Sequence, residues 1–301
     1  MKIQLITSIA LAGILISSCS KVDNLKEETS QVVNFNAGMK KATANNGITT
    51  TWSTNDQIGI FMVNNGTSDI YNAMSNRLYQ TADGSNFNAA TGQEIYFPVS
   101  GSKVDFIAYY PYRAGITNLG NFAIDLSSQT DLASNDLLWT KVDNAGIGYD
   151  KASATMVPLE FEHKLAKVVI LTSAGSGMDD SSQEWEDMEV SMSGMNTLAD
   201  FSLATGVVSN QNTPATIEPF GKTLGSRYEA IVLPKTFAAA GDFSVSFSIG
   251  TDVFVWKANA GLAFEAGKEY TIDLDIAKIG MVLGNVTIRD WQPESLTGTA
   301  N

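Results

Sequence analysis

Residues 243–276 read FSVSFSIGTDVFVWKANAGLAFEAGKEYTIDLDI. In the first seven of these residues and again in the last seven, an apolar residue alternates with a polar one. A period of two places the apolar side chains on one face of an extended strand, which is typical of a half-buried strand in an antiparallel sandwich. The polar turns at 249–252 and 265–269 separate the extended segments. We therefore predict a three-stranded meander over residues 243–276.

The same alternation recurs near the start of the chain. In QVVNFNAGM, residues 31–39, four apolar side chains share one face: Val33, Phe35, Ala37 and Met39. Other runs are mostly apolar, which indicates strands buried on both faces, or are too short to assign; they are 58–63, 104–110, 167–172 and 228–233. The most helix-tolerant segment, 179–189, has too few apolar residues for an amphipathic helix. The sequence therefore predicts an all-β fold.

The length and composition fit one large or two ordinary globular domains. The chain has 301 residues, of which 44% are hydrophobic. A polar, irregular stretch ends near residues 150–160, and a new apolar block begins after it. We predict a leader over 1–18, a flexible tether over 19–30, an N-terminal β-sandwich domain over 31–157 and a C-terminal β-sandwich domain over 158–301.

The N-terminus has the pattern of an export signal. After Met1 and Lys2, the apolar run 3–16 has the length of a signal-peptide core and is too short to span a membrane as a helix. Ser17, Ser18 and Cys19 follow, and this arrangement resembles a bacterial lipoprotein signal, in which the leader is cleaved and the cysteine is acylated. The alternative is an ordinary signal peptide with an incidental cysteine. The position and flanks of Cys19 favour lipidation.

The composition excludes several classes of function. The formal net charge is −13, so the surface repels phosphate backbones and we expect no nucleic-acid partner. Cys19 is the only cysteine and His163 the only histidine, which disfavours a disulfide, a zinc site and a Cys–His nucleophile. A Ser-His-Asp triad would have to use His163. We predict no catalytic residue, metal or cofactor.

The remaining polar and aromatic features have structural interpretations. The acidic segment 179–187 lacks the glycine and ligand spacing of a calcium loop. Asp273 and Asp275 could form a carboxylate pair, but they alternate with an apolar face and are expected to point to solvent. We expect His163 to line the start of a strand or to pack at the domain junction. The dispersed tryptophans could form a sugar-binding platform, but in β-sandwiches such residues more often serve the core.

Six segments follow one another behind the leader: TTWSTNDQIGIFM (50–62), VDFIAYYPY (104–112), LEFEHKLAKVVI (159–170), AIVLPKTF (230–237), GKEYTIDLDI (267–276) and VTIRDW (286–291). This ordered set resembles the fimbrillin family of Bacteroidales, in particular its major-fimbrium-like subunits. The resemblance covers the chain from about residue 30 to its end. It implies two tandem transthyretin-like antiparallel β-sandwich domains, a non-enzymatic protein, lipid anchoring in the outer membrane and a place on the cell surface or in a fimbrium.

The resemblance also implies an assembly mechanism. In the family, a trypsin-like protease removes an N-terminal segment that includes the first strand, and a strand from a neighbouring fimbrial subunit fills the groove. Here the candidate removable strand carries Val33, Phe35, Ala37 and Met39, and the candidate processing residues are Lys40 and Lys41. Family stalk subunits typically have an arginine there, whereas this chain has none before Arg77. The two lysines could instead be solvated loop residues.

The sequence leaves the role of the chain on the cell surface open. A processed chain fits a stalk or tip subunit, and an unprocessed chain that keeps its lipid fits an anchor. Adhesion would add a host or bacterial surface ligand as a partner. One rival interpretation is a glycan-binding surface lipoprotein that does not polymerise. Another is a surface hydrolase, for which clustered carboxylates in a cleft would be the sign.

Overall fold

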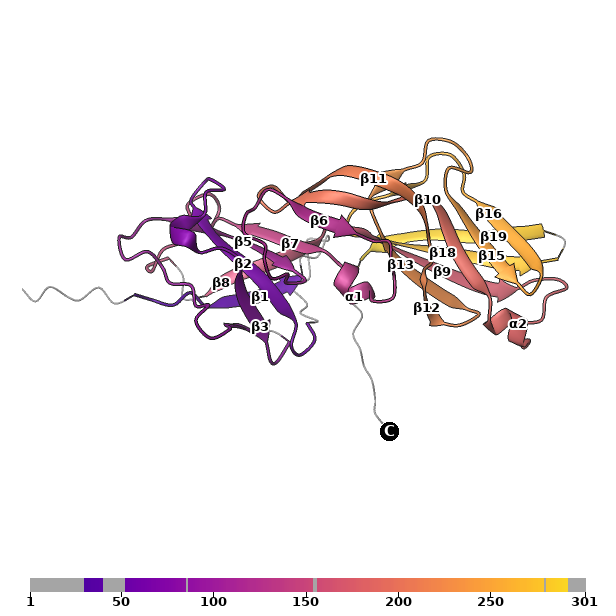
Figure 1. The fold of residues 1–301 in the computed structure, drawn as a ribbon, viewed down its shortest axis with the longest axis horizontal. Helices are drawn as coiled ribbons and strands as arrows, with labels where there is room; N and C mark the ends of the chain where they lie inside the picture. Colours follow the sequence, from indigo (N-terminus) through magenta and orange to yellow (C-terminus); the bar gives the residue numbers. More distant parts are fainter. Residues whose placement is uncertain (1–29, 40–51, 85, 154–155, 279, 292–301) are drawn as a thin grey trace, which may run out of the picture.

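The fold was analysed in a computed structural model that describes residues 30–39, 52–84, 86–153, 156–278 and 280–291. The regular structure of the described chain is mostly β-strand, which confirms the predicted all-β class. Its two halves lie end to end along the long axis of the molecule (Figure 1). No helix in these residues is long and apolar enough to cross a membrane.

The N-terminal half is a closed barrel. Its strands run in the spatial order β1-β4-β3-β2-β5-β7-β8, with β8 pairing back onto β1. The bounds are β1 (Phe35–Met39), β2 (Gln57–Asn64), β3 (Arg77–Thr81), β4 (Asn86–Ala89), β5 (Val104–Tyr110), β7 (Leu138–Val142) and β8 (Val157–His163). Closure removes the unpaired edges that a sheet otherwise presents to other chains.

In the C-terminal half, two five-stranded sheets pack face to face. One sheet has the order β11-β10-β15-β16, with β6 also paired to β10; the strands are β6 (Phe122–Asp125), β10 (Glu189–Ser202), β11 (Val207–Ile217), β15 (Ser244–Ile249) and β16 (Asp252–Lys257). The other has the order β12-β13-β9-β18-β19; the strands are β9 (Ala166–Ala174), β12 (Phe220–Thr223), β13 (Arg227–Val232), β18 (Lys268–Ala277) and β19 (Gly280–Asp290). The short strands β14 (Lys235–Thr236) and β17 (Ala263–Phe264) pair with each other.

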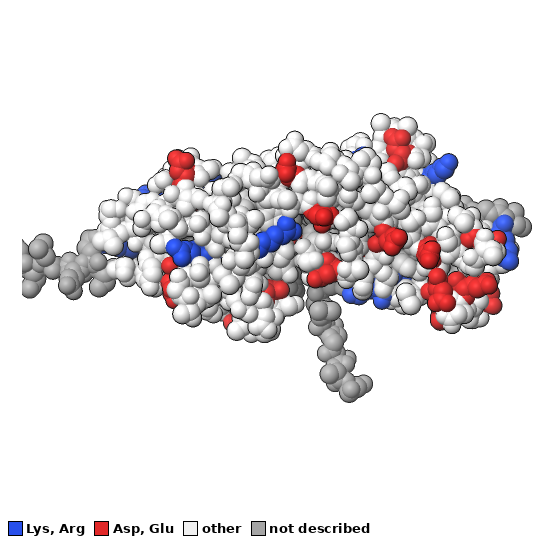
Figure 2. Space-filling view, in the orientation of Figure 1, with Lys and Arg blue, Asp and Glu red and all other residues white. Residues whose placement is uncertain are grey.

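Three short helical turns lie between the strands: η1 (Tyr71–Ala73), α1 (Leu132–Asn135) and α2 (Gln183–Glu186). Asp131 caps α1 by accepting hydrogen bonds from two backbone N–H groups, and Ser182 caps α2 by accepting one from Trp185. The acidic segment around α2 is a surface feature, because acidic side chains gather at that end of the molecule in Figure 2.

The predicted faces are confirmed, but the predicted pairing is partly wrong. The alternating apolar residues of β15 and β18 are buried between the two C-terminal sheets. β15 and β16 form the predicted hairpin, whereas β18 crosses to the opposite sheet and pairs with β9 and β19. The segment between β16 and β18 is long enough to allow this crossing. The pairs β1–β8 and β9–β18 are also parallel, so the expectation of purely antiparallel sheets is wrong in these two places.

The continuous apolar runs of β2 and β5 are buried on both faces, as predicted. Their inner side chains fill the barrel, and outer ones such as Phe61 and Tyr109 join a cluster between the halves. Residues of β6, β10 and β13 complete that cluster, including Phe122, Phe201 and Ile231. Since β6 precedes β7 in the sequence yet pairs with β10, the two halves share a sheet as well as an apolar contact.

A buried glutamine ties the halves together and yields a first prediction. Gln129 Nε2 donates to the carbonyl of Ile231 (3.1 Å), and Gln129 Oε1 accepts from the Ile231 N–H (2.9 Å). Gln129→Leu would leave both backbone groups without this partner, at about 1–3 kcal/mol for each. We expect the free energy of unfolding in urea to fall by about 2–5 kcal/mol. Gln183→Leu on the exposed side of α2 should change it by less than about 0.5 kcal/mol, and equal effects would contradict the role of Gln129.

Candidate functional site

The first strand is held between two strands that are distant in the sequence. β1 pairs antiparallel with β4, with Phe35 opposite Phe87, and parallel with β8, with Phe35 opposite Val157 and Met39 opposite Phe161. Its alternation makes this possible, because one face points into the barrel while both backbone edges bond to neighbours. β1 therefore completes the barrel as the strand between β4 and β8.

The four side chains of the candidate removable strand lie together in the barrel core. Val33, Phe35, Ala37 and Met39 are all buried in one cluster, which confirms the predicted face. Phe35 packs edge-on against Tyr79 and Phe106, each with ring centroids 5.1 Å apart. Such aromatic contacts stabilise beyond the area they bury. The strand is thus an integral part of the core and not a surface addition.

The segment before β1 extends the same groove. The N–H of Val33 donates to the carbonyl of Ile95 (2.8 Å), and the N–H of Phe97 donates to the carbonyl of Gln31 (2.9 Å). The groove that residues 31–39 occupy is therefore lined in turn by residues 95–97, by β4 and by β8. Lys40, Lys41 and Cys19 lie outside the described residues, so the processing and lipidation predictions stay predictions.

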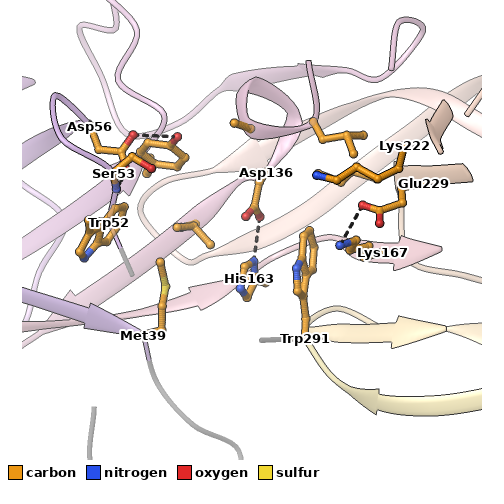
Figure 3. A pocket seen from close by; sticks show the side chains of 15 residues that line it. Met39, Trp52, Ser53, Asp56, Asp136, His163, Lys167, Lys222, Glu229 and Trp291 are labelled. Carbon is orange, nitrogen blue, oxygen red and sulfur yellow. Dashed lines mark hydrogen bonds and ion pairs between the residues drawn. The ribbon is translucent and has the colours of Figure 1, made fainter. Parts of the chain in front are cut away.

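A pocket of about 320 Å³ opens where β1 ends. It lies at the junction of the two halves, and Met39 forms part of its wall (Figure 3). Its described lining is Met39, Trp52, Ser53, Asp56, Tyr110, Leu132, Ala133, Asp136, Leu138, His163, Lys167, Lys222, Glu229, Ile231 and Trp291. We call it the junction pocket.

His163 packs at the junction, as predicted. Its Nδ1 lies 2.8 Å from Asp136 Oδ1, and its ring stacks on Trp291 with centroids 4.0 Å apart and planes at 12°. An Asp–His pair is two thirds of a catalytic triad, but the triad needs a hydroxyl on the second ring nitrogen. Here Nε2 is buried, and no side chain in the described part of the chain hydrogen-bonds to it. The contacts that the structure shows for this histidine are therefore the bond to Asp136 and the stacking on Trp291.

The charged groups around the junction pocket are paired. Burial raises the pKa of Asp56, although the Ser53 N–H (2.7 Å) and the Tyr110 hydroxyl (3.3 Å) donate to its carboxylate. Lys167 Nζ lies 3.1 Å from Glu229 Oε2. Burial alone would raise the pKa of Glu229, but Lys167 and Arg227 outweigh it and lower that pKa. Among the residues that the structure describes, no group of three or more His, Cys, Asp or Glu side chains could hold a metal ion.

The other residues singled out from the sequence have structural places. Asp275 is exposed and Asp273 half-buried, and the Ser173 hydroxyl donates to Asp275, so the two carboxylates lie on the outer face of β18 as expected. The tryptophans serve the core, because Trp139 is half-buried and the other four are buried. The buried ones are Trp52, Trp185, Trp256 and Trp291.

Sequence reasoning missed the role of Trp52. Its indole Nε1 donates to the backbone carbonyl of Ala37 (3.1 Å) and so bonds the loop before β2 to β1. Nothing in the sequence pattern pairs residue 52 with residue 37, because a side-chain bond to a carbonyl leaves no compositional signal. The junction pocket was also missed, since its lining comes from both halves of the chain.

These features define a structural β-protein whose notable element is a strand inserted in a groove. Comparison with known proteins agrees. Residues 41–291 match the model of the family described as fimbrillin-like. The chain is 33% identical over 305 residues to the "Putative fimbrium subunit Fim1C" of Bacteroides uniformis, covering 97% of this chain and 96% of that protein.

Solved structures share the fold. A "putative cell adhesion protein" from Bacteroides uniformis is 31% identical with a TM-score of 0.71, covering 87% of this chain and 98% of the other. At 10% identity, the tip fimbrial protein Mfa3 from Porphyromonas gingivalis shows a likeness of fold alone, with a TM-score of 0.55 over 87% of this chain and 100% of the other.

The chain therefore belongs to the fimbrillin-like family. This is a structural adhesion family of the Bacteroidales and not a family of enzymes. Membership implies a place at the cell surface or in a fimbrium, with other fimbrial subunits as partners.

Proposed function

We propose that this chain is a fimbrial subunit that assembles by strand addition and contributes to adhesion. One observation carries the proposal: β1 fills a groove between β4 and β8, and this strand ends at Met39, directly before Lys40 and Lys41 in the sequence. Cleavage at these lysines would free residues up to the cut. The emptied groove would then expose apolar surface and unpaired backbone groups, which a strand of a neighbouring subunit can cover.

The delivery route and domain division belong to the same proposal. Export would follow from the leader 1–18, with acylation of Cys19 anchoring the chain in the outer membrane through the tether 19–30. The two halves would be tandem transthyretin-like domains over 31–157 and 158–301. Strand β8 pairs with β1 and β7, so the first residues of the second range lie within the barrel.

A heterologous contact of this kind propagates into a filament, because each subunit offers a groove to one neighbour and a strand to another. If the cut is made, Cys19 serves only for delivery, and the chain is a stalk or tip subunit. If it is not made, Cys19 is a permanent anchor. The glycan-binding alternative gains no specific support, since the buried tryptophans form no exposed aromatic platform among the described residues.

Treatment with a trypsin-like protease tests the proposal. We expect the Cys19→Ser chain, which keeps everything except the acylated thiol, to lose residues up to Lys40 or Lys41. It should then form ladders that resist SDS. The variant Lys40→Gln/Lys41→Gln keeps Lys21 and Lys26, so it should lose no more than the tether, retain residues 31–39 and stay monomeric. A cleaved product that stays monomeric where a stalk subunit of the family polymerises would contradict a stalk role.

A further inference from the structure

Trp52 occupies a fixed place beside the groove of β1. Its ring packs edge-on against Phe87 of β4 (5.1 Å between centroids), Phe161 of β8 (5.3 Å) and Tyr110 of β5 (5.4 Å). The side chain is buried, and it borders the junction pocket next to Met39 (Figure 3). Three rings from three strands thus hold the indole in one orientation.

The indole N–H contacts the backbone of β1 and not one of its side chains. It donates to the Ala37 carbonyl at 3.1 Å, in a buried setting. A backbone carbonyl is present in any strand, so this bond does not depend on the side chain at position 37. The neighbourhood does limit that side chain, because Ala37 is fully buried in the barrel core, and overpacking a core typically costs about 1–3 kcal/mol.

Trp52 lies after Lys40 and Lys41 in the sequence, whereas Ala37 lies before them. A cut at the lysines would therefore remove the acceptor and leave the donor in the subunit. An occupant that buried this N–H again without a partner would lose about 1–3 kcal/mol, so the emptied groove would favour an occupant that restores the bond.

We propose that Trp52 is the residue of this groove that positions the inserted strand, and the proposal rests on strand addition as the function. It donates to a backbone carbonyl of the strand that another fimbrial subunit supplies and so fixes the register, while the packing around Ala37 admits only a small residue at that position. The inserted strand runs parallel to β8. It carries an aromatic residue at the position of Phe35 and an apolar one at that of Met39, where it meets the junction pocket.

The test uses a severed chain and a peptide probe. The Cys19→Ser chain receives a site for a sequence-specific protease in place of residues 42–48, is cut, and is freed of the severed strand in mild denaturant. The probe is a fluorescent peptide of residues 31–39, QVVNFNAGM, and its binding is followed by anisotropy. Three comparisons are made: Trp52→Phe in the protein, Ala37→Val in the peptide and, as the matched control, Asn34→Val at an exposed peptide position.

We expect the Kd of the probe to rise at least about tenfold with Trp52→Phe, which keeps a ring but removes the donor, and by a similar factor with Ala37→Val. The Asn34→Val peptide should bind within about threefold of the parent. If the parent peptide binds but neither change weakens it beyond the control, strand addition stands and the role of Trp52 is overturned. If the parent peptide does not bind the emptied groove, both proposals fail. If Ala37→Val weakens binding and Trp52→Phe does not, packing at position 37 alone selects the strand and the role of Trp52 is overturned as well.

Discussion

Phe35→Ala is expected to lower the free energy of unfolding by about 3–5 kcal/mol, which is typical for truncating a buried phenylalanine. Phe35 is 2% exposed and lies between the rings of Tyr79 and Phe106 at the centre of the barrel. Removing its ring would leave a cavity that the fixed strands β3 and β5 cannot close. Urea unfolding followed by tryptophan fluorescence measures the loss, because Trp52 reports from the same core.

A matched control separates burial from residue type. Phe220 on β12 is 39% exposed, so Phe220→Ala should cost less than about 1 kcal/mol. Equal losses for the two variants would show that β1 is not integral to the barrel. Severing and removing β1 should also abolish the difference between wild type and Phe35→Ala, since the substituted residue leaves with the strand.

Lys167→Ala is expected to have an effect of similar size, about 3–5 kcal/mol, because it leaves buried carboxylates without their shared cation. The Lys167 side chain is 7% exposed and lies 3.1 Å from Glu229 and 3.6 Å from Glu269, which are each 2% exposed. Arg227 and Arg289 pair with the same two carboxylates from the outer side. A row of alternating charges therefore runs across β13, β9, β18 and β19. In order, its members are Arg227, Glu229, Lys167, Glu269 and Arg289.

The lowered pKa of Glu229 determines how the destabilisation by Lys167→Ala should change with pH. In wild type the pKa of Glu229 is lowered, so its contribution to stability is present above the unfolded value of about 4.5 and is lost as the pH falls through the lower folded pKa. Without Lys167, burial is opposed only by Arg227, and the pKa of Glu229 should rise. The destabilisation by Lys167→Ala should therefore be largest near pH 7 and shrink towards pH 4.

Chemical denaturation across that pH range measures the trend. Lys257→Ala on the exposed side of β16 serves as the control and should change stability by no more than about 0.5 kcal/mol at any of these pH values. A destabilisation by Lys167→Ala that is independent of pH would assign the effect to lost packing of the lysine stem instead of lost charge.

The sequence predicted the faces of strands better than their partners. Alternation in 31–39 and 243–249 identified the buried side chains, because a period of two is a property of one strand alone. The crossing of β18 to the sheet of β9 and the parallel pairing of β1 with β8 were not predictable in this way. Both depend on which distant strand completes a sheet, and the alternating pattern is the same for either choice.

For the candidate site, too, the sequence predicted which side chains of a strand are buried but not their contacts with distant residues. The removable strand was predicted from its residues, and its burial is confirmed for Val33, Phe35, Ala37 and Met39. The bond from Trp52 to Ala37 and the stacking of His163 on Trp291 join residues far apart in the chain. Those contacts depend on the closed barrel and on the junction between the halves, so they became visible only in three dimensions.

The central claim is that β1 is a replaceable strand, and amide hydrogen exchange tests it most directly. In the uncut chain, the amides of β4 and β8 that face β1, such as Val157, which donates to Asn34 (2.8 Å), should be protected. They should lose protection once β1 is removed and regain it in the assembled ladder, while the amides between β9 and β13 stay protected throughout. Unchanged protection of β4 and β8 after removal of β1, or failure to regain it on assembly, would contradict the account.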